Sequence, residues 1–251
     1  VPEICKSEED KLSRTLYTQP CLYVVESILA DLIKEKGNQP DLVAGHSLGE
    51  YVALYAAAVF DFESGLKLVK RRSELMDSAA GGMMAALMGF KREELEAKIA
   101  QNPDVVLAND NSSSQVVISG TPEGVEAILS QVKAKRAVRL NVSGAFHSPL
   151  MANAATEFKE VLESVTFSDA AVPVLSNVDP VPAVDANLLK QRLTQQMTGA
   201  VRWRELQDEL PKQGIEQVIE IGPGKVLTGL IKRACPDLTL VNIGSAAELP
   251  G

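Results

Sequence analysis

Apolar and polar residues follow two different periods along the chain, and the changes between these periods predict helices and strands. Residues 20–36 (PCLYVVESILADLIKEK) place apolar side chains at helical spacing, and Gly37 and Pro40 end this helix. The short apolar run 41–45 (DLVAG) follows and is typical of a buried strand. We therefore expect a helix, a strand, a sharp turn at Ser47 and a further helix.

The pattern changes between Gly82 and Val142. It predicts strands at 83–90, 105–110, 114–120 and 136–143, and helices at 91–101 and 121–135. The second helix has a clear start, because Thr121 is a good N-cap and Pro122 occupies the first helical position. This βαββαβ order is that of a ferredoxin-like unit.

Helical and strand patterns alternate again in the rest of the chain. The predicted helices are 149–165, 188–197, 203–213 and 225–235, and the predicted strands are 172–177, 217–222 and 238–244. Such alternation indicates a parallel α/β sheet with helices on both faces. We expect an α/β catalytic domain, 1–80 and 147–251, with a ferredoxin-like α+β subdomain, 81–146, inserted in it. A cleft between the two is the expected ligand site.

Composition and charge narrow the function. The 251 residues carry 33 acidic and 25 basic side chains. The resulting net charge of −8 disfavours a surface that binds nucleic acid. No apolar run is long enough to span a membrane. The three cysteines are widely spaced and odd in number, so we expect reduced thiols and a cytoplasmic protein, or a stromal one in a plant or alga. Two histidines without a Cys/His cluster predict no metal site.

The stretch AGHSLGEYVAL, 44–54, contains the pattern G-x-S-x-G around Ser47. In such a turn between a strand and a helix, glycines relieve crowding and the serine hydroxyl stands exposed as a nucleophile. A serine that only caps the following helix is the alternative.

A nucleophilic serine needs a base, and the chain offers two histidines. His46 precedes Ser47 directly, and its side chain should point to the sheet side of the turn rather than along the serine hydroxyl. His147 follows a predicted strand and precedes Ser148 and Pro149, a typical helix start. Strand ends and helix starts are where open α/β sheets place their chemistry, so His147 is the candidate base. An ordinary core or surface histidine is the alternative.

The segment 64–79 (SGLKLVKRRSELMDSA) separates two adjacent arginines on a helical wheel. Arg71 shares the polar face, whereas Arg72 lies on the apolar stripe and should point inward. A buried guanidinium needs an anionic partner. Either an internal carboxylate such as Glu50 or a carboxylate of the substrate would supply it.

These residues belong to a longer pattern. The chain resembles the malonyl-CoA:acyl carrier protein transacylases, stand-alone enzymes of fatty acid synthesis related to the acyltransferase domains of polyketide synthases. The resemblance covers nearly the whole chain. It includes the motifs TQP (18–20), GHSLGEY (45–51), QVVISG (115–120), AFHSPLM (145–151), VPVLSNVD (172–179) and EIGPGKVLTGLIKR (220–233).

The resemblance implies a role for each matching position. Ser47 would be the acylated nucleophile, His147 its base, and Gln196 the residue whose main-chain carbonyl holds the histidine ring. The amide of Leu48 would bind the oxyanion. A second oxyanion donor is implied on a strand ahead of Val1. The expected substrate-binding residues are Arg72 for the malonyl carboxylate, Phe146 beside the α-carbon of the substrate, Gln19, Asn109 and Asn111.

The implied reaction is a ping-pong transfer of malonyl from malonyl-CoA to the phosphopantetheine thiol of acyl carrier protein, through a malonyl-serine intermediate. Malonyl-CoA and acyl carrier protein are thus the expected partners of a monomer that needs no cofactor. A serine thioesterase or other hydrolase, a polyketide-type acyltransferase and a carrier-binding subunit with a decayed site are the alternatives.

Overall fold

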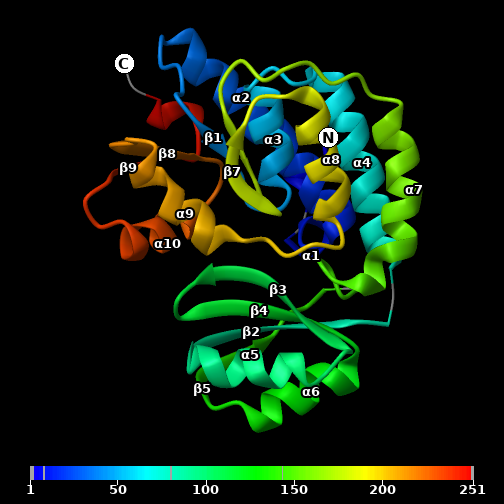
Figure 1. The fold of residues 1–251 in the computed structure, drawn as a ribbon. Helices are drawn as coiled ribbons and strands as arrows, with labels where there is room; N and C mark the ends of the chain where they lie inside the picture. Colours follow the sequence, from blue (N-terminus) through cyan, green and yellow to red (C-terminus); the bar gives the residue numbers. More distant parts are fainter. Residues whose placement is uncertain (1–2, 8, 80, 143, 250–251) are drawn as a thin grey trace.

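The computed structural model describes residues 3–7, 9–79, 81–142 and 144–249, which form two parts of unequal size (Figure 1). The smaller part, green at the bottom of the view, is one sheet with two helices on its outer face. The larger part places the remaining helices around two small sheets. None of the helices in the described ranges has the length and apolar character that crossing a membrane requires.

The larger part is formed by the beginning and the end of the chain. Its helices are α1 (Glu9–Leu12), α2 (Thr15–Glu35), α3 (Gly49–Ala56), α4 (Phe62–Ser78), α7 (Ala152–Glu163), α8 (Ala186–Gln196), α9 (Trp203–Lys212) and α10 (Val226–Ala234). Short 3-10 turns occur at Ile4–Lys6 (η1), Pro149–Met151 (η2) and Ala246–Glu248 (η3).

Two sheets supply the strands of the larger part. In the first, β1 (Val43–Ala44) pairs in parallel with β6 (Val174–Ser176), and β7 (Asp179–Ala183) runs antiparallel to β6. In the second, β8 (Gln217–Ile221) and β9 (Thr239–Ile243) are parallel. The predicted α/β fold class is confirmed, although the described strands lie in two separate sheets.

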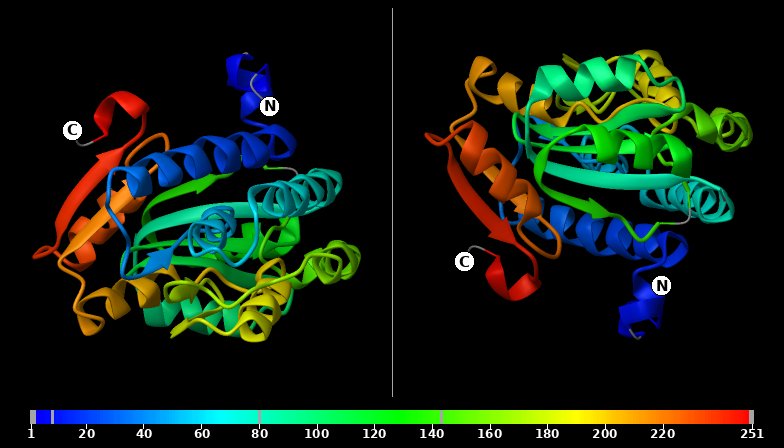
Figure 2. Two further views of the ribbon diagram at one scale, coloured as in Figure 1. Left: turned by 90° about the horizontal axis from the view of Figure 1, so that it is seen from above. Right: turned by 90° about the horizontal axis from the view of Figure 1, so that it is seen from below.

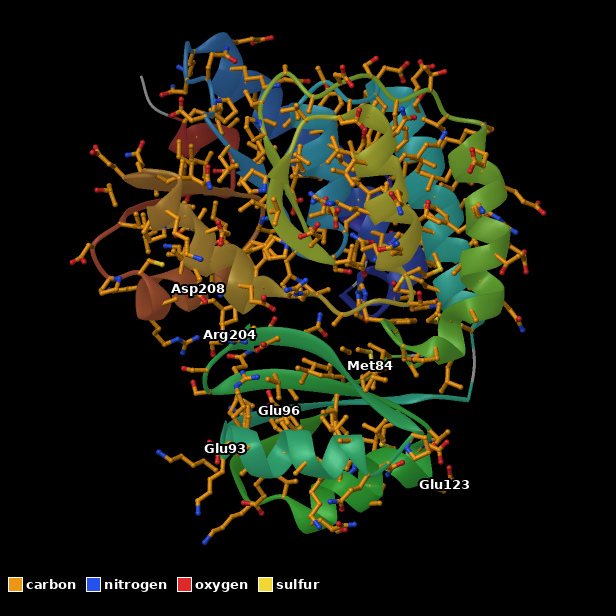
Figure 3. All side chains as sticks on the ribbon, in the orientation of Figure 1. Met84, Glu93, Glu96, Glu123, Arg204 and Asp208 are labelled. Atoms are coloured by element: carbon orange, nitrogen blue, oxygen red, sulfur yellow. The ribbon has the colours of Figure 1, made fainter. Side chains whose placement is uncertain are left out.

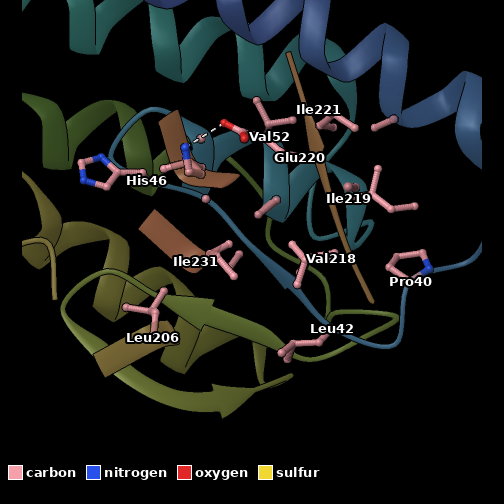
Figure 4. Close-up of a pocket in the computed structure, with 18 of the residues that line it drawn as sticks. Pro40, Leu42, His46, Val52, Leu206, Val218, Ile219, Glu220, Ile221 and Ile231 are labelled. Carbon is pink, nitrogen blue, oxygen red and sulfur yellow. Dashed lines mark hydrogen bonds between the residues drawn. The ribbon is translucent and has the colours of Figure 1, made fainter. Parts of the chain in front are cut away.

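A pocket of about 740 Å³ lies between β1 and β8 (Figure 4). Its walls are mostly apolar and include Leu42, Leu206, Val218, Ile219, Ile221 and Ile231. Within the described ranges β1 pairs only with β6 and β8 only with β9, so both strands that line the pocket keep one edge unpaired. The strand implied ahead of Val1 lies outside the described residues.

The smaller part is the predicted insert. Its elements are β2 (Met83–Phe90), α5 (Arg92–Ala100), β3 (Val105–Ser112), β4 (Gln115–Gly120), α6 (Pro122–Gln131) and β5 (Ala134–Arg139). The antiparallel sheet has the order β3-β4-β2-β5, with the crossovers of a βαββαβ unit. Seen from below, α5 and α6 lie in front of the four strands (Figure 2). The last predicted strand extended to residue 143, which lies outside the described residues.

Successive side chains of a strand point to opposite faces of a sheet, and side chains on both faces of this sheet are buried. Ala85 and Leu87 pack with Leu95 of α5 and Ile128 of α6. Met84, labelled in Figure 3, packs into the core of the larger part instead. The subdomain is therefore held against the larger part by the opposite face of its sheet, the face that carries Met84.

Among the differences from the sequence prediction, which include the unpredicted helix α1 and the earlier start of β5, two involve prolines. Helix α2 begins at Thr15 and continues through Pro20, where the missing amide removes one backbone hydrogen bond. Strand β7 was not predicted, because its sequence DPVPA contains two prolines. It lies at the edge of its sheet, the position where strand prolines are tolerated.

The turn between β1 and α3 brings two stretches of backbone into close contact. A Cβ at Gly45 would lie 1.9 Å from the carbonyl carbon of Gly49, so no side chain fits there. At Gly229 in α10, by contrast, a Cβ would meet nothing within 4 Å.

We predict that Gly45→Ala lowers the free energy of unfolding by about 1–3 kcal/mol or more, because the backbone around Ser47 must shift to admit the methyl group. Gly229→Ala is the matched control, and it should raise stability by about 0.5–1 kcal/mol through its helix propensity. Urea unfolding measures both changes. Wild-type stability in Gly45→Ala would contradict the close approach.

Candidate active site

Ser47 occupies the turn between β1 and α3 in a left-handed backbone conformation, with φ of 52°. Such a conformation is unusual for a residue other than glycine and is found at functional turns. The Ser47 Oγ lies 2.9 Å from Nε2 of His147 and also 2.9 Å from Nη2 of Arg72. Because Arg72 can only donate, the hydroxyl accepts from Arg72 and donates its own hydrogen to His147.

His147 lies between β5 and η2 and also has a positive φ, 55°. Its Nδ1 is 2.9 Å from the main-chain oxygen of Gln196 and 3.2 Å from that of Gly199. Carbonyl oxygens only accept, so Nδ1 carries the hydrogen and Nε2 is free to take one from Ser47. Burial, followed by the positive charge of Arg72, lowers the pKa of His147 to about 3, so the ring is neutral at pH 7.

Arg72 projects inward from α4, and only 1% of its surface is exposed. Nη1 donates to Oε1 of Gln19 at 2.5 Å, and Nη2 donates to Oε1 of Gln196 at 3.2 Å. The ring of Tyr51 lies 5.3 Å from the guanidinium carbon. Among the ion pairs of the described residues none involves Arg72, and its Nε has no hydrogen-bond partner there. The guanidinium is thus surrounded by neutral dipoles.

Glu50 is the buried carboxylate nearest to these groups, and it is fully covered. Its Oε2 accepts hydrogen bonds from Nε2 of Gln196 at 2.7 Å and from the amide of Asn177 at 3.1 Å. Burial raises the pKa of Glu50. Gln196 therefore stands between Glu50 and Arg72, and the direct Glu50–Arg72 pair considered from the sequence is not formed.

The Leu48 amide is available as a donor at the turn. The amide of Ser47 donates to Oδ1 of Asn177 at 2.7 Å, and the amide of Gly49 donates to the His46 carbonyl at 3.0 Å. No hydrogen bond from the Leu48 amide is formed within the part of the chain that the structure describes. It lies directly after the nucleophile at the start of α3, which suits the oxyanion role expected of it.

The other expected substrate-binding residues lie around this centre. Gln19 holds the guanidinium of Arg72, and Phe146 is buried in the core directly before His147. Asn109 is buried on β3 beside Val201. The side chain of Asn111 is 2.8 Å from Nε2 of His46, whose ring packs on Trp203. Contact of these side chains with substrate stays a prediction.

The inserted subdomain fixes the loop that holds His147. Strand β3 forms two backbone hydrogen bonds with Val201, at 2.8 Å to the carbonyl of Ala108 and at 2.9 Å from the amide of Asp110. Val201 follows the carbonyls of Gln196 and Gly199 closely in sequence. Asp110 also forms an ion pair with Arg204 of α9, at 2.9 Å, and Arg204 is labelled in Figure 3. The base is therefore positioned from both parts of the molecule.

Two contributors to the site were not predicted from the sequence: Asn177, and Tyr51, whose ring faces the guanidinium of Arg72. Asn177 ends a predicted strand, the usual position of chemistry in such sheets, and this was the available signal. Tyr51 could be read only as an apolar helix residue. The contacts of both depend on chain segments far apart in sequence.

The arrangement suits nucleophilic attack on an activated carbonyl. A hydroxyl faces a neutral imidazole, a free amide follows it, and a buried cation lies beside it. No group of three or more His, Cys, Asp or Glu side chains that could hold a metal ion occurs in the described ranges.

Comparisons with known proteins agree with this chemistry. Residues 1–249 match the family of acyl transferase domains. The chain is 61% identical to a malonyl CoA-acyl carrier protein transacylase of Synechocystis over 99% of its own length and 85% of the relative. The crystal structure of the Synechocystis sp. PCC 6803 enzyme superposes with a TM-score of 0.96 over 98% of this chain and 84% of the other.

A second solved structure contains a carrier protein. It is a complex of a type II PKS acyl-carrier protein with its malonyl-transacylase, PlMCAT:AntF. That chain is 37% identical to this one and superposes with a TM-score of 0.91, over 97% of this chain and 82% of that one.

The two histidines make the charge state of the base measurable, because an NMR titration shows only two imidazole rings. We predict that His147 stays neutral well below pH 6.5 and that Arg72→Ala raises its pKa, since the charge of Arg72 is the second cause of the lowered value. Arg71→Ala, at an exposed ion pair with Glu157, is the control and should change nothing. Titration of His147 near 6.5 in the wild type would contradict the buried, neutral base.

Proposed function

The chain belongs to the acyl transferase domain family, and we propose that it transfers malonyl groups from malonyl-CoA to the phosphopantetheine thiol of acyl carrier protein. The proposal gives Ser47 the role of nucleophile and His147 that of general base. It gives Arg72 the role of substrate-carboxylate receptor.

One observation carries this substrate assignment. The Arg72 Nη2 lies 2.9 Å from the Ser47 Oγ, and Arg72 forms no ion pair with a carboxylate of the described chain. A carboxylate bound to Arg72 would therefore lie very close to the carbonyl carbon that Ser47 attacks. In a malonyl thioester a single methylene separates these two groups. The spacing thus favours a malonyl group over a longer dicarboxylic acyl group or an uncharged one.

In the first half-reaction, Ser47 attacks the thioester carbonyl and its proton passes to Nε2 of His147. The Nδ1–H of His147 keeps donating to the Gln196 carbonyl, which fixes the ring while it carries charge. The Leu48 amide donates to the oxyanion. In the free enzyme the charge of Arg72 lowers the pKa of His147. A bound malonyl carboxylate would offset this charge, so the His147 ring becomes more basic when the correct substrate is present.

Collapse of the tetrahedral intermediate breaks the carbon–sulfur bond. The proton on His147 then goes to the departing CoA thiolate, and malonyl-Ser47 remains. Burial lowers the pKa of His147, which favours release of this proton from the imidazolium. In the second half-reaction the phosphopantetheine thiol gives its proton to Nε2 of His147 and attacks the carbonyl of malonyl-Ser47. The carbon–oxygen bond to Ser47 then breaks, and His147 returns the proton to the Ser47 Oγ.

A hydrolase is the second candidate, because the same serine and histidine could activate water. In α/β-hydrolases, however, an acidic residue lies between serine and histidine in the chain and orients the ring. Here main-chain carbonyls occupy that position on His147. A carrier-binding subunit with a decayed site is disfavoured too, since His147 and Arg72 both lie within hydrogen-bond distance of the Ser47 Oγ.

The remaining assignments are part of the same proposal. Serine, imidazole and guanidinium supply every group the transfer uses, so we expect no cofactor. We place the enzyme in the cytoplasm and its carrier protein in fatty acid biosynthesis, with a polyketide carrier as the alternative. Comparing transfer to the two kinds of carrier protein decides between these pathways.

We predict that Arg72→Ala lowers kcat/KM for malonyl-CoA at least about tenfold to a hundredfold, because each hydrogen bond to a charged group contributes about 1.5–3 kcal/mol. Transfer of acetyl from acetyl-CoA, which has no carboxylate, should fall little or rise. Arg71→Ala is the matched control, since it removes the neighbouring arginine from the exposed face of the same helix.

The experiment measures both donors with carrier protein as acceptor, and circular dichroism confirms folding of each variant. Equal losses for malonyl and acetyl in folded Arg72→Ala would assign Arg72 a structural role. Release of free malonate at the same rate with and without carrier protein would instead favour the hydrolase.

A further inference from the structure

Asn177 follows strand β6 and is completely buried beside the nucleophile turn. Its side chain contacts the backbone of that turn at two points. Oδ1 accepts from the amide of Ser47 at 2.7 Å, and Nδ2 donates to the carbonyl of Gly45 at 2.6 Å. The residue lies 130 positions from Ser47 in sequence, so the contact is purely tertiary.

The partners determine the orientation of this amide. The Ser47 amide can only donate and the Gly45 carbonyl can only accept, so a flipped side chain would face both with the wrong group. The two hydrogen bonds join Asn177 to Gly45 and to Ser47, the residues before and after His46. They tie together the ends of the turn in which Ser47 adopts its positive φ of 52°.

The same residue is connected to the base. The backbone amide of Asn177 donates to Oε2 of Glu50 at 3.1 Å, and Nε2 of Gln196 donates to the same oxygen at 2.7 Å. The main-chain carbonyl of Gln196 holds His147. A displacement of Asn177 would therefore reach both the nucleophile and the residue that orients its base.

The two hydrogen bonds from the Asn177 side chain to Gly45 and Ser47 form a clamp on the turn. This clamp also determines which backbone amide can bind the oxyanion. Asn177 occupies the Ser47 amide, whereas the next amide, that of Leu48, has no partner among the hydrogen bonds of the described residues. If the clamp were lost, the Ser47 amide would be released and the direction of the Leu48 amide would no longer be fixed.

We propose that Asn177 is a positioning residue for acyl transfer, whose side-chain amide holds Ser47 and Leu48 in the reactive geometry by clamping the backbone at Gly45 and Ser47. The proposal rests on the function proposed above. Asn177 itself contacts none of the reacting atoms, so its removal should affect kcat rather than KM.

The test compares Asn177→Ala and Asn177→Asp with wild type in malonyl transfer to carrier protein. Asn177→Ala should lower kcat about a hundredfold with little change in KM, because the nucleophile and the oxyanion donor are misplaced. Asn177→Asp should be similarly impaired at neutral pH, since a carboxylate keeps an acceptor for Ser47 but repels the Gly45 carbonyl.

Acid should restore Asn177→Asp selectively. A protonated carboxyl has one hydroxyl donor for the Gly45 carbonyl and one carbonyl acceptor for the Ser47 amide, the pair that the native amide supplies. Burial and the neighbouring Glu50 both favour the protonated form, while His147 stays neutral as the pH falls. The ratio of variant to wild-type kcat should therefore rise as the pH is lowered.

Asn102→Asp is the matched control, because Asn102 also accepts from one backbone amide and donates to one backbone carbonyl, within the inserted subdomain. Its activity ratio to wild type should not change with pH. A pH-independent ratio for folded Asn177→Asp, or wild-type kcat in Asn177→Ala, overturns the positioning role. Should Asn177→Ala not fold, the acid rescue of Asn177→Asp still decides. Absence of transfer by the wild type would instead count against the proposed function.

Discussion

The site depends on a positive charge that the protein buries without giving it an ion-pair partner in the described chain. A buried charge is costly unless it is compensated, and here the compensation comes from amide oxygens, a serine hydroxyl and an aromatic ring around Arg72. Glu50 is close enough to favour the charged form of Arg72, but its hydrogen bonds are used by Gln196 and Asn177. The guanidinium consequently remains available to an incoming carboxylate. It also lies against the Ser47 hydroxyl and lowers the pKa of His147, so in the proposed mechanism the same charge would select the substrate and tune the base.

Maintaining this arrangement requires contributions from the whole fold. Ser47 and His147 both adopt positive φ, and both are held by groups distant in sequence. Asn177 clamps the turn of Ser47, and the loop that orients His147 is pinned to strand β3 of the inserted subdomain through Val201. The subdomain is therefore more than a cover over a cleft. It is one of the two supports of the loop that orients His147, the proposed base.

Much of this could be predicted from sequence because it follows from local patterns. The period changes predicted the α/β fold class, the glycine motif predicted a sharp turn at Ser47, and the helical wheel placed Arg72 inside. What could not be predicted depends on long-range contacts: Gln19 and Gln196 reach Arg72 from 53 and 124 residues away. The two prolines of β7 prevented the prediction of an edge strand. The position of Asn177 at the end of a strand indicated that it lies near the site, but not that it would hydrogen-bond to the backbone at Ser47.

The most direct test of the central claim, that Ser47 accepts a malonyl group under the control of Arg72 and His147, is the intact mass of the complete protein after mixing with malonyl-CoA. Peptide mapping of the product locates the modification. The account predicts one malonyl group per chain on Ser47, none on Ser47→Ala, and loss of the group when carrier protein with its phosphopantetheine thiol is added. An unmodified protein, or a malonyl group on any peptide without Ser47, would contradict it.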